Sequence, residues 1–360
     1  MRNTGTRGYS GYRGRRGGGS PLLPLLLLLL VLLAAVIFLV VQRYLVFSGD
    51  GSHHFELPWE RHSVETEAPQ KTAAGLEIVI EQPEEEPEPP AAEPQPSALL
   101  HAQELDSSAL TGGMERSLAA LPASMNAVAI RVKNVDGDLL YPSALELALS
   151  AGAVQGSSIA RSAIEDVTAT EYYTIARLSA LHDSRFSFAH MTDAGVLQKA
   201  YRNNIWYAPD SSFYLAPEKE LTREYLAAIA AEVAELGFDE LLFDEFGYPA
   251  RGRLNNIDES ARTVTKQEAL ATLAASLREV ATAHDVRLSV VLDETTVLSG
   301  GNEVTGQELS TLANLFDRVY VPTTVEQLPA LQAALEPYPA ELVPMLTAEP
   351  DSETYLVIPE

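Results

Sequence analysis

From about residue 98 onward, the chain alternates between two patterns of apolar positions. Short apolar runs are typical of buried strands, whereas apolar residues that recur every three or four positions mark one face of a helix. The strands predicted in this way are 98–105, 126–133, 172–178, 241–243, 287–292, 318–321, 342–346 and 355–358. The predicted helices are 110–121, 158–168, 221–236 and 325–335, with two more beginning at the capping boxes Thr265-x-x-Glu268 and Thr305-x-x-Glu308.

These strands, with helices between most of them, predict one α/β domain at 98–360. Strand–helix repetition over about 250 residues is typical of a (β/α)8 TIM-like barrel, and an open doubly wound sheet is the alternative. The last strand breaks the regularity, because only residues 348–354 precede it and a parallel crossover usually needs a dozen or more. We therefore expect the barrel to be irregular there, with the last strand antiparallel, displaced or absent.

Two acidic residues follow the short apolar run Leu241–Phe243 in the middle of this domain. Gly237 suits the left-handed position that ends a helix, and Asp244 and Glu245 then fall at the carboxyl end of the strand. Ligands and catalytic groups of parallel α/β folds gather at this end of the strands. Strand alternation predicts that Asp244 faces one side of the strand and Glu245 the other, so that only one of them faces the barrel mouth. A solvated loop or a helix cap is the alternative for such a pair.

A second acidic pair, Asp293-Glu294, ends the next predicted strand. Consecutive barrel strands are neighbours about 5 Å apart. Cleavage of a glycosidic bond needs two carboxyl groups, about 5–5.5 Å apart for retention and about 6.5–9.5 Å apart for inversion. We therefore predict Asp244 as nucleophile or charge stabiliser and Glu294 as the acid/base, with Asp293 as its alternative.

Polar and aromatic residues near other strand ends and in the connecting loops are candidates for binding the substrate: Lys133, Arg177, His182, Asp183, Trp206, Tyr214, Glu245 and Tyr248. An arginine on a barrel strand can hold a substrate hydroxyl or orient Asp244, and it can equally pair with a buried carboxylate. Loop aromatic rings can stack on sugar rings or fill the barrel. Lys133 can also form an ion pair, and His182 and Asp183 can also be a loop histidine and a helix cap.

Several of these segments resemble a bacterial family known as the putative glycoside hydrolase domain family. The resemblance covers roughly 98–350, and it is clearest in Gly237-Phe238-Asp239-Glu240 followed by Phe243-Asp244 and Pro249. Weaker matches are Ala127–Lys133 with Asp136-Gly137 and Tyr141-Pro142-Ser143, and Ile175-Ala176-Arg177 with Asp183. The resemblance implies an amylase-like barrel and glycoside hydrolase activity. The sequence departs from the family's pattern at Arg131, Ala216, Gly247 and Val291, where the family usually has polar or charged residues of other kinds.

The residues before the domain divide into three predicted segments. Residues 1–20 form a basic, glycine-rich tail, and residues 21–43 include an apolar run at 21–41 that is long enough to span a bilayer. Five arginines precede this run, which predicts a signal-anchor helix with a cytoplasmic N-terminus; a cleaved signal peptide is the alternative. Residues 44–97 are rich in proline and glutamate, which is typical of an extended linker without a core.

Charge and composition exclude several classes of ligand and bond for this domain. Six arginines lie at or before position 43, and the remaining 19 basic residues face 50 acidic ones, so the domain would repel nucleic acid. The chain has no cysteine, which excludes disulfides and thiolate metal sites. The histidines His53, His54 and His62 lie in the linker, so we predict no metal site there and no cofactor.

The sequence therefore predicts a single-pass protein of the cell membrane whose C-terminal, extracellular domain hydrolyses a polysaccharide or cell-wall glycan through paired carboxylates. The alternative is a catalytically degenerate barrel that binds glycan or serves as a scaffold of the cell envelope.

Overall fold

The computed structural model describes residues 99–201, 203–260, 262–350 and 354–359, and the backbone of two short strands, β1 (Leu45–Phe47) and β2 (His53–Phe55), which pair antiparallel. The predicted tail at 1–20, the predicted membrane span at 21–43 and the rest of the predicted linker at 44–97 lie outside the described residues. Within the described part of the chain, no helix combines the length and the apolar character needed to cross a bilayer.

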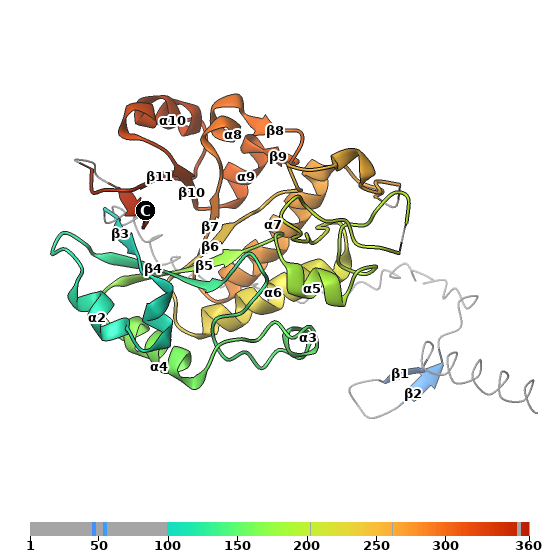
Figure 1. The fold of residues 1–360 in the computed structure, drawn as a ribbon, viewed down its shortest axis with the longest axis horizontal. Coiled ribbons are helices and arrows are strands. Elements are labelled where there is room, and N and C mark those ends of the chain that lie inside the picture. The colour runs from blue at the N-terminus through green and yellow to red at the C-terminus, as the bar shows by residue number, and fades with distance from the viewer. Residues whose placement is uncertain are drawn as a thin grey trace, which may run out of the picture. The chain divides into compact units, whose positions relative to one another are not determined.

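Eight parallel strands close into a barrel, shown in Figure 1. Their order around the barrel is β10, β11, β12, β3, β4, β5, β6 and β7. The strands are β3 (His101–Glu104), β4 (Ala127–Lys133), β5 (Tyr173–Ser179), β6 (Glu240–Asp244), β7 (Arg287–Val291), β10 (Arg318–Pro322), β11 (Glu341–Leu346) and β12 (Tyr355–Val357). Each overlaps a strand predicted from the sequence, so the TIM-like α/β barrel is confirmed and the open sheet is not.

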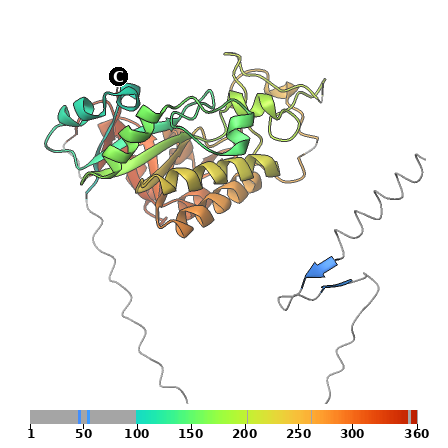
Figure 2. The same ribbon diagram turned by 90° about the horizontal axis from the view of Figure 1, so that it is seen from below.

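Helices lie around the barrel, and Figure 2 shows two long ones, in yellow and orange, side by side along it. The helical segments are η1 (Ser107–Thr111), α2 (Met114–Ala119), α3 (Glu146–Ser150), α4 (Ser158–Thr168), α5 (Ser184–Ala189), α6 (Glu220–Glu235), η2 (Leu254–Asn256), α7 (Lys266–Ala283), α8 (Glu294–Ser299), α9 (Leu309–Leu315), η3 (Val325–Gln327) and α10 (Leu328–Leu335). The long pair is α6 and α7. The predicted capping box at Thr265 begins α7, because Thr265 accepts from the Glu268 N–H and Glu268 accepts from the Thr265 N–H.

The alternating faces of the strands form two separate cores. In β6, Leu242 packs inside the barrel with residues such as Ala129, Ile175 and Met345, while Phe243 packs between the barrel and its helices. Because β6 is buried along its whole length, the apolar run in the sequence predicted its position correctly. Alternation then places Asp244 on the same inward side as Leu242.

The expectation for the last strand was wrong. β12 is parallel to both of its neighbours, pairing Leu356 with Met345 of β11 and with Ala102 of β3. The usual minimum for a parallel crossover assumes that the chain returns along the full length of a strand. Here β12 pairs only with the last two residues of β11. The connecting segment therefore runs back along about two residues of β11, roughly 7 Å, and can be short.

The predicted helix start at Thr305 was also wrong. Residues 301–308 instead form an antiparallel pair of two-residue strands, β8 (Gly301–Asn302) and β9 (Gln307–Glu308), and α9 begins only after them. The Thr305 hydroxyl donates to Gln307 rather than capping a helix. Gly306, with φ at 78°, turns the chain in a left-handed conformation inside the expected first turn, which a helix cannot accommodate.

Candidate functional site

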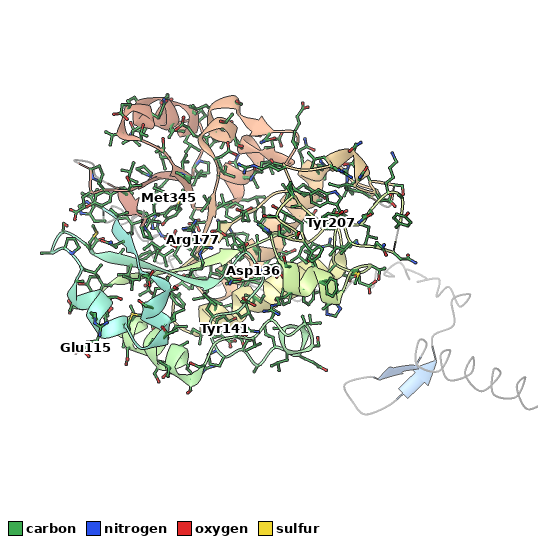
Figure 3. The ribbon with its side chains drawn as sticks, viewed as in Figure 1. Glu115, Asp136, Tyr141, Arg177, Tyr207 and Met345 are labelled. Carbon is green, nitrogen blue, oxygen red and sulfur yellow. The ribbon has the colours of Figure 1, made fainter. Side chains whose placement is uncertain are left out.

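Four charged side chains form a ring at the carboxyl end of the barrel, which we call the mouth ring: Glu104, Arg131, Arg177 and Asp244. Arg177 lies near the centre of the barrel in Figure 3. Its Nε donates to Asp244 Oδ2 at 2.8 Å and its Nη1 to Glu104 Oε2 at 2.5 Å. Arg131 places Nη1 2.9 Å from the same Asp244 oxygen and Nη2 3.8 Å from Glu104 Oε1. Two guanidinium groups thus balance the charges of two carboxylates.

The two oxygens of Asp244 have different surroundings. Oδ2 is in contact with both arginines, whereas Oδ1 is buried and has no hydrogen-bond partner among the described residues. A buried polar atom without a partner costs free energy, and such atoms concentrate at sites that bind ligands. Asp244, predicted as the nucleophile, is therefore held in a fixed orientation with one oxygen uncommitted.

Glu104 was not among the sequence candidates. It ends β3, a four-residue strand whose sequence, His-Ala-Gln-Glu, is weakly apolar and carries no motif. The available signal was alternation, because the burial pattern makes Ala102 and Glu104 share the inward side. Only closure of the barrel, with β3 between β12 and β4, brings Glu104 to Arg131 and Arg177.

A hollow of about 500 Å³ lies at the same end of the barrel, and we call it the side hollow; Glu245 lines it, whereas none of the four residues of the mouth ring does. It lies over the carboxyl ends of β5, β6 and β7. Its charged and polar lining residues are His182, Asp210, Tyr214, Glu245, Tyr248, Arg251, Asp293, Thr305 and Gln307. Three carboxylates against one guanidinium make its wall acidic.

An aromatic stack forms one wall of the side hollow. The rings of His182 and Tyr214 are parallel, with an angle of 8° and centroids 4.4 Å apart. Trp206 meets Tyr214 edge-on from behind, is 2% exposed and donates from Nε1 to the Arg253 carbonyl. Burial, followed by the charges of Glu245 and Asp210, raises the pKa of the Tyr214 hydroxyl to about 12. Of these predicted aromatic contacts, Tyr214 faces the hollow and Trp206 supports it from the core.

Asp210 lines the same hollow, from the loop that also carries Trp206 and Tyr214. Hydrogen bonds from the Ser212 hydroxyl and backbone N–H hold the pKa of the Asp210 carboxyl below its ordinary value of 3.8. Asp210 and Arg251 were not among the sequence candidates, because each lies in a long loop without periodicity. Their place in the hollow is decided by how those loops fold over the barrel.

Glu245 does not follow the alternation predicted for it. It has φ at 52°, one of three non-glycine residues with positive φ in the described part of the chain, together with Ser211 and Asp285. This left-handed turn directly after β6 brings its side chain to the side hollow, where Oε2 lies 3.7 Å from His182 Nδ1. Both acidic residues of the pair therefore reach the carboxyl face of the barrel, by different routes.

The second acidic pair begins a helix. Asp293 caps α8, with Oδ1 accepting from the Thr296 N–H and Oδ2 from the Thr296 hydroxyl, and it lines the side hollow. Glu294 accepts a hydrogen bond of 2.7 Å from the Thr323 hydroxyl after β10, and it is not among the residues of the hollow. Pairing Val290 with Phe243 places these acids beyond the level of Asp244.

Two of the predicted binding residues form a buried pair. Lys133 Nζ lies 2.8 Å from Asp183 Oδ2 and donates to the Ser179 carbonyl, and both side chains are fully buried. Asp183 also caps α5 by accepting from the Phe186 N–H. The structure therefore does not bring Lys133 or Asp183 into the side hollow; they join the ends of β4 and β5 behind it.

Tyr248 closes the far side of the hollow. Its hydroxyl donates to Glu218 at 2.6 Å, and the ammonium of Lys266 lies 5.3 Å from its ring centre. Burial, and then the charge of Glu218, raises the pKa of the Tyr248 hydroxyl. The ring is thus held in place by the loops after β5 and β6.

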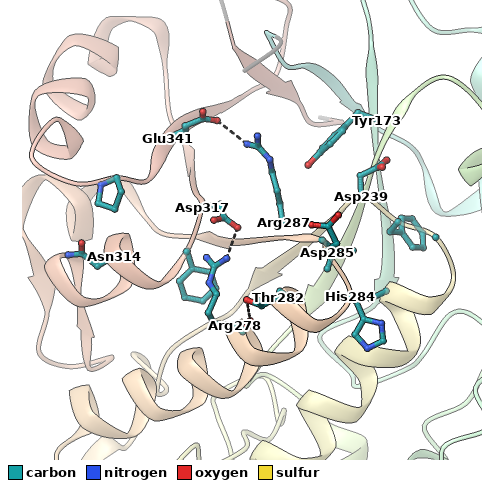
Figure 4. A pocket seen from close by; sticks show the side chains of 17 residues that line it. Tyr173, Asp239, Arg278, Thr282, His284, Asp285, Arg287, Asn314, Asp317 and Glu341 are labelled. Carbon is teal, nitrogen blue, oxygen red and sulfur yellow. Dashed lines mark hydrogen bonds and ion pairs between the residues drawn. The ribbon is translucent and has the colours of Figure 1, made fainter. Parts of the chain in front are cut away.

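A larger depression, of about 970 Å³, lies at the opposite, N-terminal end of the barrel, as Figure 4 shows. Its charged residues are largely paired, Arg278 with Asp317 and Arg287 with Glu341. The N-terminal face of such barrels serves stability, whereas ligands bind at the carboxyl face. We therefore assign the site to the mouth ring and the side hollow. Among the described residues, no group of three or more histidine or acidic side chains is arranged to hold a metal ion.

Comparison with known proteins agrees with this fold. The glycoside hydrolase domain of PgaB (BpsB) from Bordetella bronchiseptica matches with a TM-score of 0.51 and 16% identity, over 73% of this chain and 94% of that one. A hypothetical protein from Ruminiclostridium thermocellum shares 24% identity over 54% of this chain and 96% of that one, with a TM-score of 0.44. The exo-β-N-acetylglucosaminidase of Vibrio harveyi shares 12% identity over 70% and 42%, with a TM-score of 0.45.

No curated protein matches the sequence. The family described as "Putative glycosyl hydrolase domain" matches residues 112–322, a segment that runs from the start of α2 to the end of β10 and contains the central motif with Asp244. This match covers more than half of the chain and confirms the resemblance seen in the sequence. The chain belongs to this glycosyl hydrolase domain family.

Proposed function

We propose that this protein hydrolyses glycosidic bonds of a polysaccharide at the mouth of its barrel. The observation that carries the proposal is the geometry of Asp244. It lies at the carboxyl end of β6, faces into the barrel and keeps one oxygen without a partner, and the residue that follows it, Glu245, lines a hollow that opens to solvent. Membership of the glycosyl hydrolase domain family supports the same reaction class.

The residues around Asp244 suit the charge that develops during the reaction. The transition state of glycoside hydrolysis resembles an oxocarbenium ion, so a carboxylate beside the anomeric carbon stabilises it. Arg131 and Arg177 fix the orientation of that carboxylate through Oδ2. The stacked pair of His182 and Tyr214 offers a flat wall for the apolar face of a sugar ring.

The second carboxylate comes from the acids around the mouth. Glu294 and Asp293 are the candidates from the sequence, and both follow β7, the neighbour of β6. We further propose, from the sequence alone, that the predicted helix at 21–43 anchors the protein in the cell membrane with the barrel outside. The substrate would then be a polysaccharide or cell-wall glycan.

The test is a hydrolysis screen of the full-length protein against cell-envelope and extracellular polysaccharides. We expect Asp244→Asn to lower the rate at least about 10²-fold, because it removes the charge that stabilises the transition state. Its thermal midpoint should stay near that of the parent protein. Asp285→Asn is the matched control, because Asp285 is an exposed acidic residue at the other end of the barrel. Equal rates for the parent and Asp244→Asn would contradict the proposal.

A second function, glycan binding without cleavage, is favoured by one observation. Both arginines contact Asp244 Oδ2, so the carboxylate is already charge-balanced before any sugar arrives. A barrel of this kind would bind oligosaccharides but release them unchanged. Calorimetric titration of the same glycans distinguishes the two functions, since binding without products would identify a glycan-binding protein.

A further inference from the structure

We propose that Glu245 is the proton donor of the site, so that both reacting carboxylates come from adjacent positions of one strand end. This inference rests on the proposed function and assigns a role that the acids after β7 are less suited to fill.

The backbone at Glu245 departs from the path that a strand would take. With φ at 52°, the residue adopts a left-handed conformation, which a side chain with a Cβ occupies only at a cost. Regular alternation would have sent Glu245 outward with Phe243, into the layer of helices. The left-handed turn brings it to the side hollow instead. Non-glycine residues in such conformations cluster at active sites, where the fold maintains them.

The carboxylate of Glu245 is free to act, in contrast to those of its competitors. No described residue donates a hydrogen bond to it, and its side chain is 45% exposed in the hollow. Asp293 uses both oxygens to accept from Thr296, and Glu294 accepts from Thr323 outside the hollow. Of these three acids, Glu245 alone combines access to the hollow with an uncommitted carboxylate.

The position of Glu245 relative to Asp244 also fits the reaction. Consecutive Cα atoms are about 3.8 Å apart, and these two side chains leave the chain on different sides. Side chains of this length can separate two carboxyl groups by about 5–9.5 Å, the range that glycosidases use. The scissile bond would then lie between the mouth ring and the side hollow.

His182 is suited to position Glu245. Its Nδ1 lies 3.7 Å from Glu245 Oε2, its ring is fixed by stacking on Tyr214, and its buried Nε2 has no partner among the described residues. The other charged groups of the hollow are Asp210, Arg251 and Asp293.

The proposed reaction balances as follows. The bond between the anomeric carbon and the glycosidic oxygen breaks, and the departing oxygen takes the proton from Glu245. Asp244 meanwhile stabilises the positive charge at the anomeric carbon, either by ion pairing or by a covalent bond. Water then supplies a hydroxyl group to that carbon and returns a proton to Glu245, which restores both carboxyl groups.

The test compares Glu245→Gln with the parent full-length protein on the polysaccharide cleaved in the screen. We expect kcat to fall about 10²–10⁴-fold, the usual contribution of a general acid. The alkaline limb of the pH–rate profile should disappear with it. A dinitrophenyl glycoside of the same sugar needs no protonation of its leaving group. The rate at which Glu245→Gln cleaves this glycoside should therefore lie within tenfold of the parent's rate. Glu245→Asn, which suits a left-handed backbone better, should lose activity while remaining folded.

The controls separate this inference from the proposed function. Asp285→Asn also alters an acidic residue with positive φ, on the opposite face of the barrel, and should leave kcat unchanged. If Asp244→Asn is inactive while Glu245→Gln retains the parent kcat and pH profile, the role of Glu245 is refuted and the glycosidase stands. If the parent protein cleaves no glycan, the role of Glu245 and the proposed glycosidase function are both refuted. Equal losses on the polysaccharide and the activated glycoside would also refute a role in protonation.

Discussion

Strand β6 carries a carboxylate at each end of the barrel, and the two have different surroundings. Glu240, at the N-terminal end, is completely buried, and its Oε2 accepts from Arg318 Nη1 at 2.6 Å and from the Tyr173 hydroxyl at 3.0 Å. Its Oε1, like Oδ1 of Asp244, has no hydrogen-bond partner among the described residues. Asp244, at the carboxyl end, contacts two arginines whose side chains are 14% and 27% exposed. Arg318, by contrast, is 4% exposed. One strand therefore carries a carboxylate paired with arginine at each of its ends. The arginine is almost fully buried at the N-terminal end, whereas the two arginines at the carboxyl end are partly exposed to solvent.

The difference separates a structural ion pair from a site that can bind a ligand. A buried charge must be compensated inside the protein, because water no longer solvates it, and Arg318 compensates Glu240 through Nη1 while its Nε donates to Glu341 at 3.0 Å. At the mouth, the arginines serve two carboxylates and remain partly hydrated, so a sugar can replace water without leaving a charge unpaired. Three predictions test this contrast through stability, beginning with the largest effect.

Arg318→Met should destabilise the protein by about 3–5 kcal/mol, because it leaves Glu240 charged and buried without its partner. The measurement is the midpoint and slope of urea unfolding. The double variant Arg318→Met with Glu240→Leu removes both charges and should recover most of the loss. If the single variant unfolds at the same urea concentration as the parent, the ion pair between Arg318 and Glu240 does not stabilise the fold as expected.

Arg177→Met should cost less stability, roughly 1–3 kcal/mol, although Arg177 contacts two carboxylates. Arg131 remains beside both Glu104 and Asp244, and water reaches the pair from the mouth. The same unfolding experiment measures this loss, and the hydrolysis assay should show a much larger effect on activity than on stability. A loss of stability equal to that of Arg318→Met would remove the distinction between the two ends.

Alkaline pH should produce the smallest difference between the ends. Burial, and then the charge of Glu240, raises the pKa of Tyr173 well above its ordinary value of 10.0, while Tyr214 at the mouth rises to about 12. Below pH 10 both states keep the proton, so stability does not change. Above it the unfolded chain loses the proton first, and stability falls, for Tyr214 mainly between pH 10 and about 12.

The corresponding variants, Tyr173→Phe and Tyr214→Phe, should each flatten the decline of the unfolding midpoint between pH 10 and about pH 12. Unfolding in urea at several pH values gives the slopes, and the parent protein provides the reference. Both tyrosines lose a proton in the same window at first, so the effects should be similar up to pH 11 and larger for Tyr173 beyond it. A larger effect of Tyr214→Phe at the highest pH would contradict the prediction, because it would mean that burial raises the pKa of Tyr214 more than that of Tyr173.

Local signals in the sequence predicted most of the barrel. The segment predicted as a helix at 158–168 is α4, and the capping box at Thr265 begins α7, because both depend on neighbouring residues. The identical box pattern at Thr305 failed, since Gly306 and the pairing of β8 with β9 compete with a helix there. The parallel β12 was missed because its register against β11 is a property of the closed barrel.

The candidate site likewise combines features that local sequence predicted with features that only the folded barrel decides. The inward side of Asp244 followed from strand alternation, a local rule. The sequence offered no means of placing Glu104 beside Arg177, which lies 73 positions away. Alternation predicted that Glu245 lies on the side opposite to Asp244, because it assumes regular strand geometry, and the left-handed backbone at Glu245 ends that geometry.

The order of the eight barrel strands, the family and the inward carboxylate of β6 were determined by the sequence itself, because each depends on periodicity or on a contiguous motif. Tertiary structure alone decided which charges meet at the mouth, which acid caps α8 and which carboxylate accepts no hydrogen bond in the side hollow. Contacts of this kind join residues far apart in the chain, and they form only when closure of the barrel fixes the register of all eight strands.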